Sequence, residues 1–396
     1  MKKKYILSLL FKNRKGLFQL KEYNKKAKEF WKRKKSELTE EITKTFRKAS
    51  DEDLMKICDE FKEETGFSEF GCTKEEISEI RKVMREFGQD EVIKDFVEYG
   101  TRTGFLTMVI APALAAAEGA GDVEKNVIDE WLYAIGICLP VSADICDSIM
   151  DKEVINHPSI PKKVWINIHK LGAAIIFYRA KKHMRRIKTN NKKLNKRIME
   201  RVKQGIKKVS EKQMMDLEVK KSAYVPLSKL EEIYDGKICE IEATVFGTLP
   251  SKKMNIVKTF EKGASFFAGE MQVVDDIEDL LGDANIGKKP EIPNPSFFLT
   301  YCFDLWNSGE RNIKEIMKKA ARKTLKKGEE YHRKVVEAYE KLPKKFPTRP
   351  FFDIILWYYN KVLKDRVKEF LKGKTFAVLE PQLKKILETK SNLNSV

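Results

Sequence analysis

The sequence predicts an all-α protein, and three observations lead to that prediction. Only 20 Gly and 13 Pro interrupt a chain of 396 residues. Leu, Lys, Glu, Ala and Met, which favour helices, dominate its long stretches. No segment of about four to eight alternating apolar residues is bounded by turn residues, as a strand in a sheet would be.

The composition predicts a folded chain with a sizeable core, because 42% of its residues are hydrophobic and 35% are charged. We expect a basic, aromatic-rich N-terminal extension over 1–50 and a helical domain over 51–371. A polar C-terminal tail is expected over 372–396. Apolar patterns predict helices at 105–117, 127–150, 257–281, 312–341 and 351–371. Prolines and paired asparagines predict loops at Asn190–Asn191, Pro226, Pro250 and 290–295.

The formal net charge of +19 points to nucleic acid, a membrane surface or a small anion as partner. The basic stretch 181–208 has no aromatic platform on which bases would stack, so we expect no nucleic-acid partner. Residues 1–50 fit an amphipathic helix that makes a peripheral contact with an anionic membrane. They fit an ordinary helix packed on the main domain equally well, and both interpretations stay open.

Six cysteines are scattered without a CxxC pair, which argues against a zinc knuckle or a disulfide scaffold and fits a reducing cytoplasm. The short apolar run near the N-terminus is closed by Lys12 and Arg14 and has no cleavage site, so no signal peptide is expected. No uninterrupted apolar run reaches the roughly 18 residues of a transmembrane helix. A cytoplasmic protein is therefore expected.

The most specific motif is QVVDDIED at 272–279. On a helix, Asp275, Asp276 and Asp279 share one face, where their carboxylates repel one another. A solvated acidic surface is one interpretation, but the apolar flanks place this helix near the core. Buried carboxylates need a positive partner. Mg²⁺ is suited to this, since it takes one or two carboxylates and completes its shell with water and phosphate oxygens.

A second cluster follows the same pattern, with Asp144, Asp147 and Asp151 spaced by three and four residues on an otherwise apolar helix. Two such helices predict a bundle with a metal-filled cavity. There, two or three Mg²⁺ ions would bind a diphosphate and neutralise it as its carbon–oxygen bond breaks. The allylic cation that results requires a dry, apolar cavity.

The order of these motifs resembles the trans-isoprenyl diphosphate (polyprenyl) synthase family. Residues 272–288 read QVVDDIEDLLGDANIGK, which is similar to the family's second aspartate-rich motif, and 147–151 stand in the place of the first. Gln213-Met-Met-Asp216-Leu217, followed by 225–237, resembles the stretch that leads to a diphosphate-binding lysine. The resemblance covers about 95–366. It implies a class I isoprenoid-synthase helical bundle around a deep central cavity, assembled as a homodimer or as a heterodimer with another synthase subunit.

The resemblance also implies roles for particular residues. The Mg²⁺ ligands would be Asp147, Asp151, Asp275, Asp276 and Asp279, with Asp144 in place of an aspartate that the first motif lacks. Lys237 and Lys288 would hold the allylic isoprenyl diphosphate, and Asp147, Asp151, Asp275, Asp276 and Lys237 would form the catalytic set. Gln213, Asp216 and Gln272 would support them. Ser142 and Ala143 would form a small floor of the product pocket, which favours products of about twenty carbons or more.

The sequence departs from the family where isopentenyl diphosphate would bind. Of the family's Gly-Lys-Arg-x-Arg-Pro motif, only Gly100 and Arg102 are present, and 153–158 contain no arginine. Each lost charged hydrogen bond weakens binding by about 1.5–3 kcal/mol. The lysines at 152, 162 and 163 are candidates to replace them.

Three functions remain open at this stage. The first is a Mg²⁺-dependent prenyltransferase that condenses an allylic diphosphate with isopentenyl diphosphate to a longer polyprenyl diphosphate. The second is a terpene cyclase-like enzyme that acts on a single allylic diphosphate. The third is a non-catalytic synthase subunit, which the retained aspartates argue against. We expect the prenyltransferase.

Overall fold

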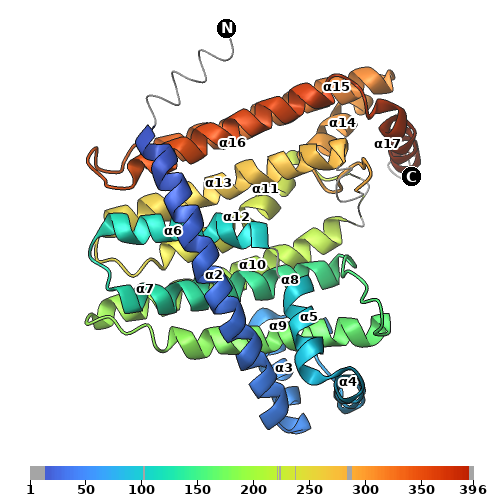
Figure 1. Cartoon of the computed structure of the whole chain (residues 1–396). Helices are drawn as coiled ribbons and strands as arrows, with labels where there is room; N and C mark the ends of the chain where they lie inside the picture. The colour runs from blue at the N-terminus through green and yellow to red at the C-terminus, as the bar shows by residue number, and fades with distance from the viewer. Residues whose placement is uncertain are drawn as a thin grey trace. The chain divides into compact units, whose positions relative to one another are not determined.

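The computed structural model describes residues 14–100, 103–220, 222, 224–236, 238–282 and 288–391. Within these ranges the regular structure is helical and contains no β-strand, which confirms the predicted all-α class (Figure 1). The chain divides into two compact units. Unit 1 comprises Met1–Ser210, Thr244–Val257 and Lys345–Phe351, and unit 2 comprises Glu211–Ala243, Lys258–Lys344 and Phe352–Val396. Each unit is described by itself.

Unit 1 is built from the N-terminal helices and the first part of a long tenth helix. Its elements are α2 (Arg14–Lys48), α3 (Asp51–Thr65), η1 (Ser68–Phe70), α4 (Lys74–Phe87), α5 (Gln89–Gly100), α6 (Thr103–Ala120), α7 (Lys125–Trp131), η2 (Leu132–Cys138), α8 (Leu139–Met150), α9 (Lys162–Met184) and the start of α10 (Lys192–Val219). Helix α9 is the hub of the unit, since it packs on α2, α3, α4, α5, α7, α8 and η2. An added Cβ at Gly172 of α9 would lie 2.2 Å from Cζ of Phe96, so a glycine there lets α5 approach closely.

Local sequence explains where several of these helices begin and end. Ser50 and Asp53 form a capping box at the start of α3, and Thr73 and Glu76 form another at the start of α4. Each N-cap is worth about 1 kcal/mol because it satisfies backbone donors that have no partner within the helix. Gly66, with a φ of 73°, ends α3.

Helix α2 packs on α5, α6 and α9 and buries Tyr23, Ala27, Phe30 and Trp31. For residues 14–48, the interpretation as a helix packed on its own unit is therefore the one that the structure supports. The first 13 residues lie outside the described part of the chain, and the membrane contact expected for residues 1–50 stays untested.

The helix predicted at 127–150 is present as α7, η2 and α8, with a π-helical stretch in the middle. This helix, Lys125–Met150, is the one in the described ranges that is long and apolar enough to cross a membrane by length and composition alone. Its most apolar window is 67% buried inside the protein, as expected for a core helix.

Unit 2 contains the later helices of the chain. They are the end of α10, α11 (Leu227–Gly236), the start of α12 (Ile238–Gly247), most of α13 (Met254–Leu281), α14 (Phe297–Asn307), α15 (Ile313–Tyr339), most of α16 (Arg349–Phe370) and α17 (Phe376–Ser391). Its core joins Val273 and Ile277 of α13 to Phe297 of α14 and Ile316 of α15. The predictions of helices at 257–281, 312–341 and 351–371 are confirmed.

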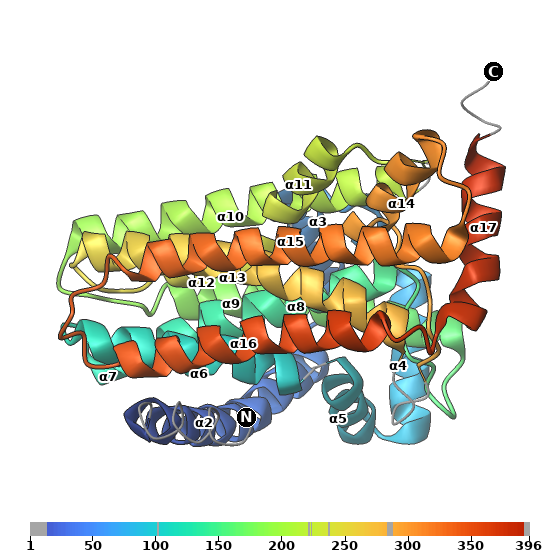
Figure 2. The same ribbon diagram turned by 90° about the horizontal axis from the view of Figure 1, so that it is seen from above.

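Part of the expected polar tail is helical. Helix α17 buries Leu379, Leu383 and Leu387, which recur every four residues and so form one apolar stripe. It packs beside the start of α15 (Figure 2), where Lys314 and Glu380 pair at 3.7 Å. The leucine stripe explains why this segment folds although most of its other residues are polar.

Candidate functional site

The first aspartate cluster lies on α8 in unit 1. Asp144, Asp147 and Asp151 are all half-buried, and Asp151 is the C-cap of the helix. The spacing of three and four residues places them on one stripe, as the sequence predicted. The three aspartates are therefore accessible to solvent, and they lie in the last turns of α8.

The end of α8 has a defined turn that positions Asp151. Lys152 adopts a φ of 62°, a left-handed conformation that glycine usually occupies. Its N–H donates to the carbonyl of Ile149 at 3.1 Å, and the N–H of Glu153 donates to the carbonyl of Ser148 at 2.8 Å. This pair of hydrogen bonds is a Schellman motif, and it places a lysine directly after the aspartate stripe.

The two residues predicted for the floor of a product pocket have different environments. Ser142 is 2% exposed, and its hydroxyl donates to the carbonyl of Ala173 on α9 at 3.0 Å. Ala143 is half-buried. Ser142 therefore belongs to the contact between α8 and α9, and Ala143 is the one that lies four residues before Asp147, on the aspartate stripe.

The second aspartate cluster lies on α13 in unit 2, and its three members differ in exposure. Asp275 is exposed, Asp279 is half-buried and Asp276 is only 2% exposed. The three carboxylates therefore differ in their access to solvent. Asp275 and Asp279 are accessible, whereas Asp276 is turned into the unit.

Hydrogen bonds hold the buried Asp276 in place. The Tyr234 hydroxyl is 3.1 Å from Oδ2 and 3.3 Å from Oδ1 of this carboxylate, and Nε2 of Gln272 donates to Oδ1 at 3.2 Å. Burial raises the pKa of Asp276 to about 8, against the opposing effect of these hydrogen bonds, and the charges of Asp275 and Asp279 raise it further.

Tyr234 is a site residue that the sequence analysis missed. It is buried, and its ring packs edge-on against Phe297 at 4.9 Å. Burial raises the pKa of Tyr234 well above its usual value, and the negative charges of Asp276 and Asp216 add to this effect. In the sequence, a single tyrosine within a helix does not indicate a functional residue. Its importance follows only from the contact with Asp276.

The supporting residues predicted on α10 lie in the same unit. Gln213 and Asp216 are both buried, and Nζ of Lys220 pairs with Asp216 at 3.2 Å. Because the charge of Asp216 acts on Tyr234, this part of α10 lies close to the Tyr234–Asp276 pair. The structure thus brings α10, α11 and α13 together at one polar site inside unit 2.

Lys288 meets the aspartate cluster directly. Its Nζ donates to Oδ1 of Asp279 at 2.5 Å and lies 3.6 Å from Oε1 of Glu291. The residue predicted to hold a diphosphate therefore neutralises one of the predicted metal ligands. Two further predicted residues, Lys237 and Arg102, fall outside the described residues.

The donor set fits Mg²⁺ bound together with a substrate. In the described residues, no group of three or more His, Cys, Asp or Glu side chains converges as a closed protein cage would require. Mg²⁺ needs only one or two carboxylates and completes its octahedron with water and phosphate oxygens. The accessible carboxylates of Asp275 and Asp279 meet that requirement.

In the metal-free protein, the free energy of unfolding is expected to fall as the pH rises from about 4 to about 8. The carboxyl of Asp276 ionises near pH 3.8 when unfolded, whereas its folded pKa is about 8. The folded state therefore keeps a proton that the unfolded state has lost, and this stabilisation disappears as the pH approaches 8. At about 1.4 kcal/mol per pKa unit, the change amounts to a few kcal/mol.

Thermal unfolding with a chelator between about pH 5 and 8 checks this prediction. Asp276→Asn keeps an acceptor for Tyr234 and should make the pH dependence shallower, and the slope that remains is due in part to Glu242, whose pKa burial also raises to about 8. Asp275→Asn, at the exposed neighbouring position, is the control and should retain it. Equal slopes in the wild type and Asp276→Asn would contradict the prediction.

Comparison with known proteins identifies the class of fold. No family model and no curated protein matches the sequence. Solved structures do match. A geranylgeranyl pyrophosphate synthetase from the archaeon Geoglobus acetivorans has a TM-score of 0.53 at 15% identity, over 71% of this chain and 94% of that one. A decaprenyl diphosphate synthase from Rhodobacter capsulatus has a TM-score of 0.51 at 14% identity, over 74% and 96% of the two chains.

A third match is a polyprenyl synthase from Caulobacter crescentus CB15, solved with calcium and isoprenyl diphosphate. Its TM-score is 0.50 at 14% identity, over 73% of this chain and 97% of that one. These likenesses show that the chain has the isoprenoid-synthase helical fold. At the level of the fold, the resemblance to the polyprenyl synthases that the motifs predicted is confirmed, with a strongly divergent sequence.

Proposed function

We propose that this protein is a Mg²⁺-dependent prenyltransferase that ionises an allylic isoprenyl diphosphate and condenses it with isopentenyl diphosphate. One observation carries the proposal. In a chain with the isoprenoid-synthase fold, α13 presents accessible Asp275 and Asp279 beside a buried Asp276 that Tyr234 and Gln272 hold in place. On a helix face that is merely solvated and acidic, a buried carboxylate held by hydrogen bonds from two side chains would not be expected.

The proposed roles follow from exposure and contacts. Asp275 and Asp279 are the primary metal ligands on α13, and Asp276 is a supporting carboxylate that Tyr234 orients. Lys288 pairs with Asp279 in the metal-free protein. Lys288 would contact the diphosphate as a point charge, and Mg²⁺ held by Asp275 and Asp279 would neutralise the leaving group. In unit 1, Asp147 and Asp151 of α8 are the proposed metal ligands.

The substrate and the metal are supported by the solved structures of similar fold. The Caulobacter crescentus protein was solved with calcium and isoprenyl diphosphate. Calcium and Mg²⁺ share oxygen ligands, and Mg²⁺ suits a site with few carboxylates better because it relies on water and phosphates. Bound Mg²⁺ would neutralise the diphosphate leaving group.

Isopentenyl diphosphate needs cations that replace the arginines missing from this sequence. Lys152, Lys162 and Lys163 are exposed, and in the described ranges none of them has an ion pair. Lys152 follows the aspartate stripe directly, and the other two begin α9. We propose these three lysines as the contacts of the second diphosphate.

The terpene cyclase-like alternative is favoured by one specific observation, which is the loss of those arginines around 100–105 and 153–158. An enzyme with one diphosphate substrate would not need them. Its metal ligands would be the same aspartates, so only the products separate the two functions.

Product analysis with Mg²⁺ and a fifteen- or twenty-carbon allylic diphosphate tests the proposal. We expect a longer diphosphate that forms only when isopentenyl diphosphate is present. A hydrocarbon or alcohol formed without isopentenyl diphosphate would establish the cyclase-like function instead. If no product forms in either reaction, the chain acts as a subunit without its own activity and the proposal is wrong.

A further inference from the structure

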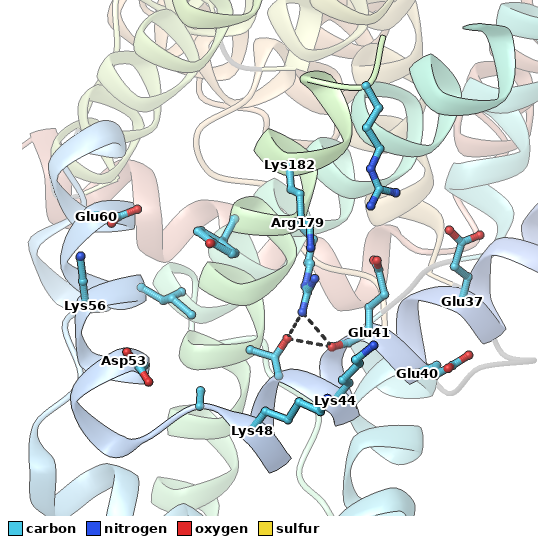
Figure 3. A pocket seen from close by; sticks show the side chains of 15 residues that line it. Glu37, Glu40, Glu41, Lys44, Lys48, Asp53, Lys56, Glu60, Arg179 and Lys182 are labelled. Atoms are coloured by element: carbon cyan, nitrogen blue, oxygen red, sulfur yellow. Dashed lines mark hydrogen bonds between the residues drawn. The ribbon is translucent and has the colours of Figure 1, made fainter. Parts of the chain in front are cut away.

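A polar groove in unit 1 contains none of the aspartates discussed above. Its volume is about 680 Å³, and α2, α3 and α9 form its walls (Figure 3). Apart from Ala49, Ile57 and Tyr178, its lining side chains are polar or charged. A hydrocarbon chain would bury little apolar surface there, so the groove suits a hydrophilic ligand.

Six cationic side chains line this groove, and they come from all three helices. They are Lys44, Lys48, Lys56, Arg179, Lys182 and Arg186. Arg179 and Lys182 lie three residues apart on one face of α9, and Arg186 follows the end of that helix. The four lysines have no ion pair in the part of the chain that the structure describes. Like charges held this close repel one another, and an anion between them would remove that cost.

Carboxylates also line the groove, but two of them are engaged elsewhere. Glu37 pairs with Lys34 at 2.7 Å. Glu41 accepts a hydrogen bond from the Tyr133 hydroxyl at 3.0 Å and lies 3.1 Å from Nε2 of His183. Since the pKa of Glu41 is lowered by His183 against the opposing effect of burial, this carboxylate stays charged and bound to its own partners.

A third carboxylate, Asp53, accepts the backbone N–H of Ser50 at 3.0 Å and so completes the cap of α3. Only Glu40 and Glu60 remain among the acidic residues that line the groove. Asp53 keeps its charge, so six cations face three carboxylates that have no ion pair in the described part of the chain, and the groove still has an excess of positive charge.

The side chain of Arg179 connects two of the helices that line the groove, α9 and α2. From α9 it reaches α2, where its Nη2 donates to the hydroxyl of Thr45 and lies 3.5 Å from the carbonyl of Glu41 (Figure 3). Its Nε is buried without a hydrogen-bond acceptor among the described residues.

We propose that this groove binds an anion that carries one or more phosphate groups, held by Lys44 and Lys48 of α2, by Arg179 and Lys182 of α9, and by Arg186, which follows the end of α9. A soluble diphosphate and the phosphate headgroup of an anionic lipid share this chemistry. The inference does not depend on the prenyltransferase activity, because none of these residues has a role in it.

Binding by a double variant, Lys44→Ala with Lys48→Ala, tests the proposal in the full chain. Both side chains are exposed, so the variant should fold. The matched control is Lys28→Ala with Lys32→Ala, which removes the same charge from exposed positions of the same helix that do not line the groove. Titration calorimetry with inorganic diphosphate is run with a chelator, so that metal-dependent binding at the aspartates is absent.

A second arm measures co-sedimentation with phosphatidylglycerol vesicles against phosphatidylcholine vesicles. We expect binding of at least one probe to weaken about tenfold in Lys44→Ala/Lys48→Ala and to stay within about twofold in the control. A loss in the diphosphate titration identifies a soluble anion, and a loss only with anionic vesicles identifies a lipid headgroup. Absence of binding to both probes, or an equal loss in the control, would overturn the proposal.

Discussion

Replacing Asp275 with alanine is expected to lower Mg²⁺-dependent turnover by about a thousandfold or more, because the accessible carboxylate of the α13 cluster is lost. The same loss is expected for Asp147→Ala on α8. In the proposed mechanism each change removes a ligand for the ions that would neutralise the leaving diphosphate, so the effect is expected on the transition state. Turnover of an allylic diphosphate at saturating substrate, followed against Mg²⁺ concentration, measures it.

Matched controls separate metal binding from a general loss of negative charge. Glu278→Gln removes one charge from the same turn of α13, but Glu278 pairs with Arg366 at 2.7 Å and has no role in the proposed site. Glu153→Gln does the same beyond α8, where Glu153 is exposed. Both controls should stay within about twofold of the wild type. Unchanged turnover in Asp275→Ala or Asp147→Ala, with the helical fold intact, would contradict the metal-clamp mechanism.

Much of the fold follows from the sequence because its helices are long and strongly patterned. The helix expected at 257–281 is α13, Met254–Leu281, and the one expected at 351–371 is α16, Arg349–Phe370. Both carry wide apolar faces, which are the most reliable signal of a helix. Helix α17 was not expected because its apolar stripe is narrow and follows Gly373.

The candidate site was predictable only in part. The spacing of the aspartates places them on one helix, but it does not show that Asp276 is buried while Asp275 is exposed. That difference depends on Tyr234, which belongs to another helix and forms a contact across 42 residues of sequence. Contacts of this kind depend on how helices pack together. They cannot be predicted from the hydrophobic pattern of one helix or from the spacing of its aspartates.

The pairing of Lys288 with Asp279 illustrates the same point. The resemblance assigned one residue to the diphosphate and the other to the metal, as if the two were separate. In the structure they neutralise each other, because a partly buried carboxylate takes the nearest cation. A resemblance of motifs assigns a role to each residue separately and does not show which of the side chains pair with one another.

Replacing Ala143 with phenylalanine is expected to shorten the product by about one isoprene unit or more. Ala143 lies four residues before Asp147, so the two side chains share a face of α8. In the proposed reaction, a product chain that grows from a diphosphate near Asp147 would pass the preceding turn of that face, where Ala143 lies. A phenyl ring there would block it, since core volume is filled closely and accommodates little extra. Chromatography of the dephosphorylated products measures chain length.

Ser142→Ala is the informative control for this experiment. Ser142 is next to Ala143 in sequence, but its hydroxyl donates to the Ala173 carbonyl at 3.0 Å and its side chain is buried between α8 and α9. Removing it should lower the free energy of unfolding by about 1 kcal/mol and leave product length unchanged. A wild-type product distribution from Ala143→Phe, or a shorter product from Ser142→Ala, would mean that the chain does not pass along the Asp147 face. The two neighbours therefore test which face of α8 the growing chain follows, a question that the sequence motif leaves open.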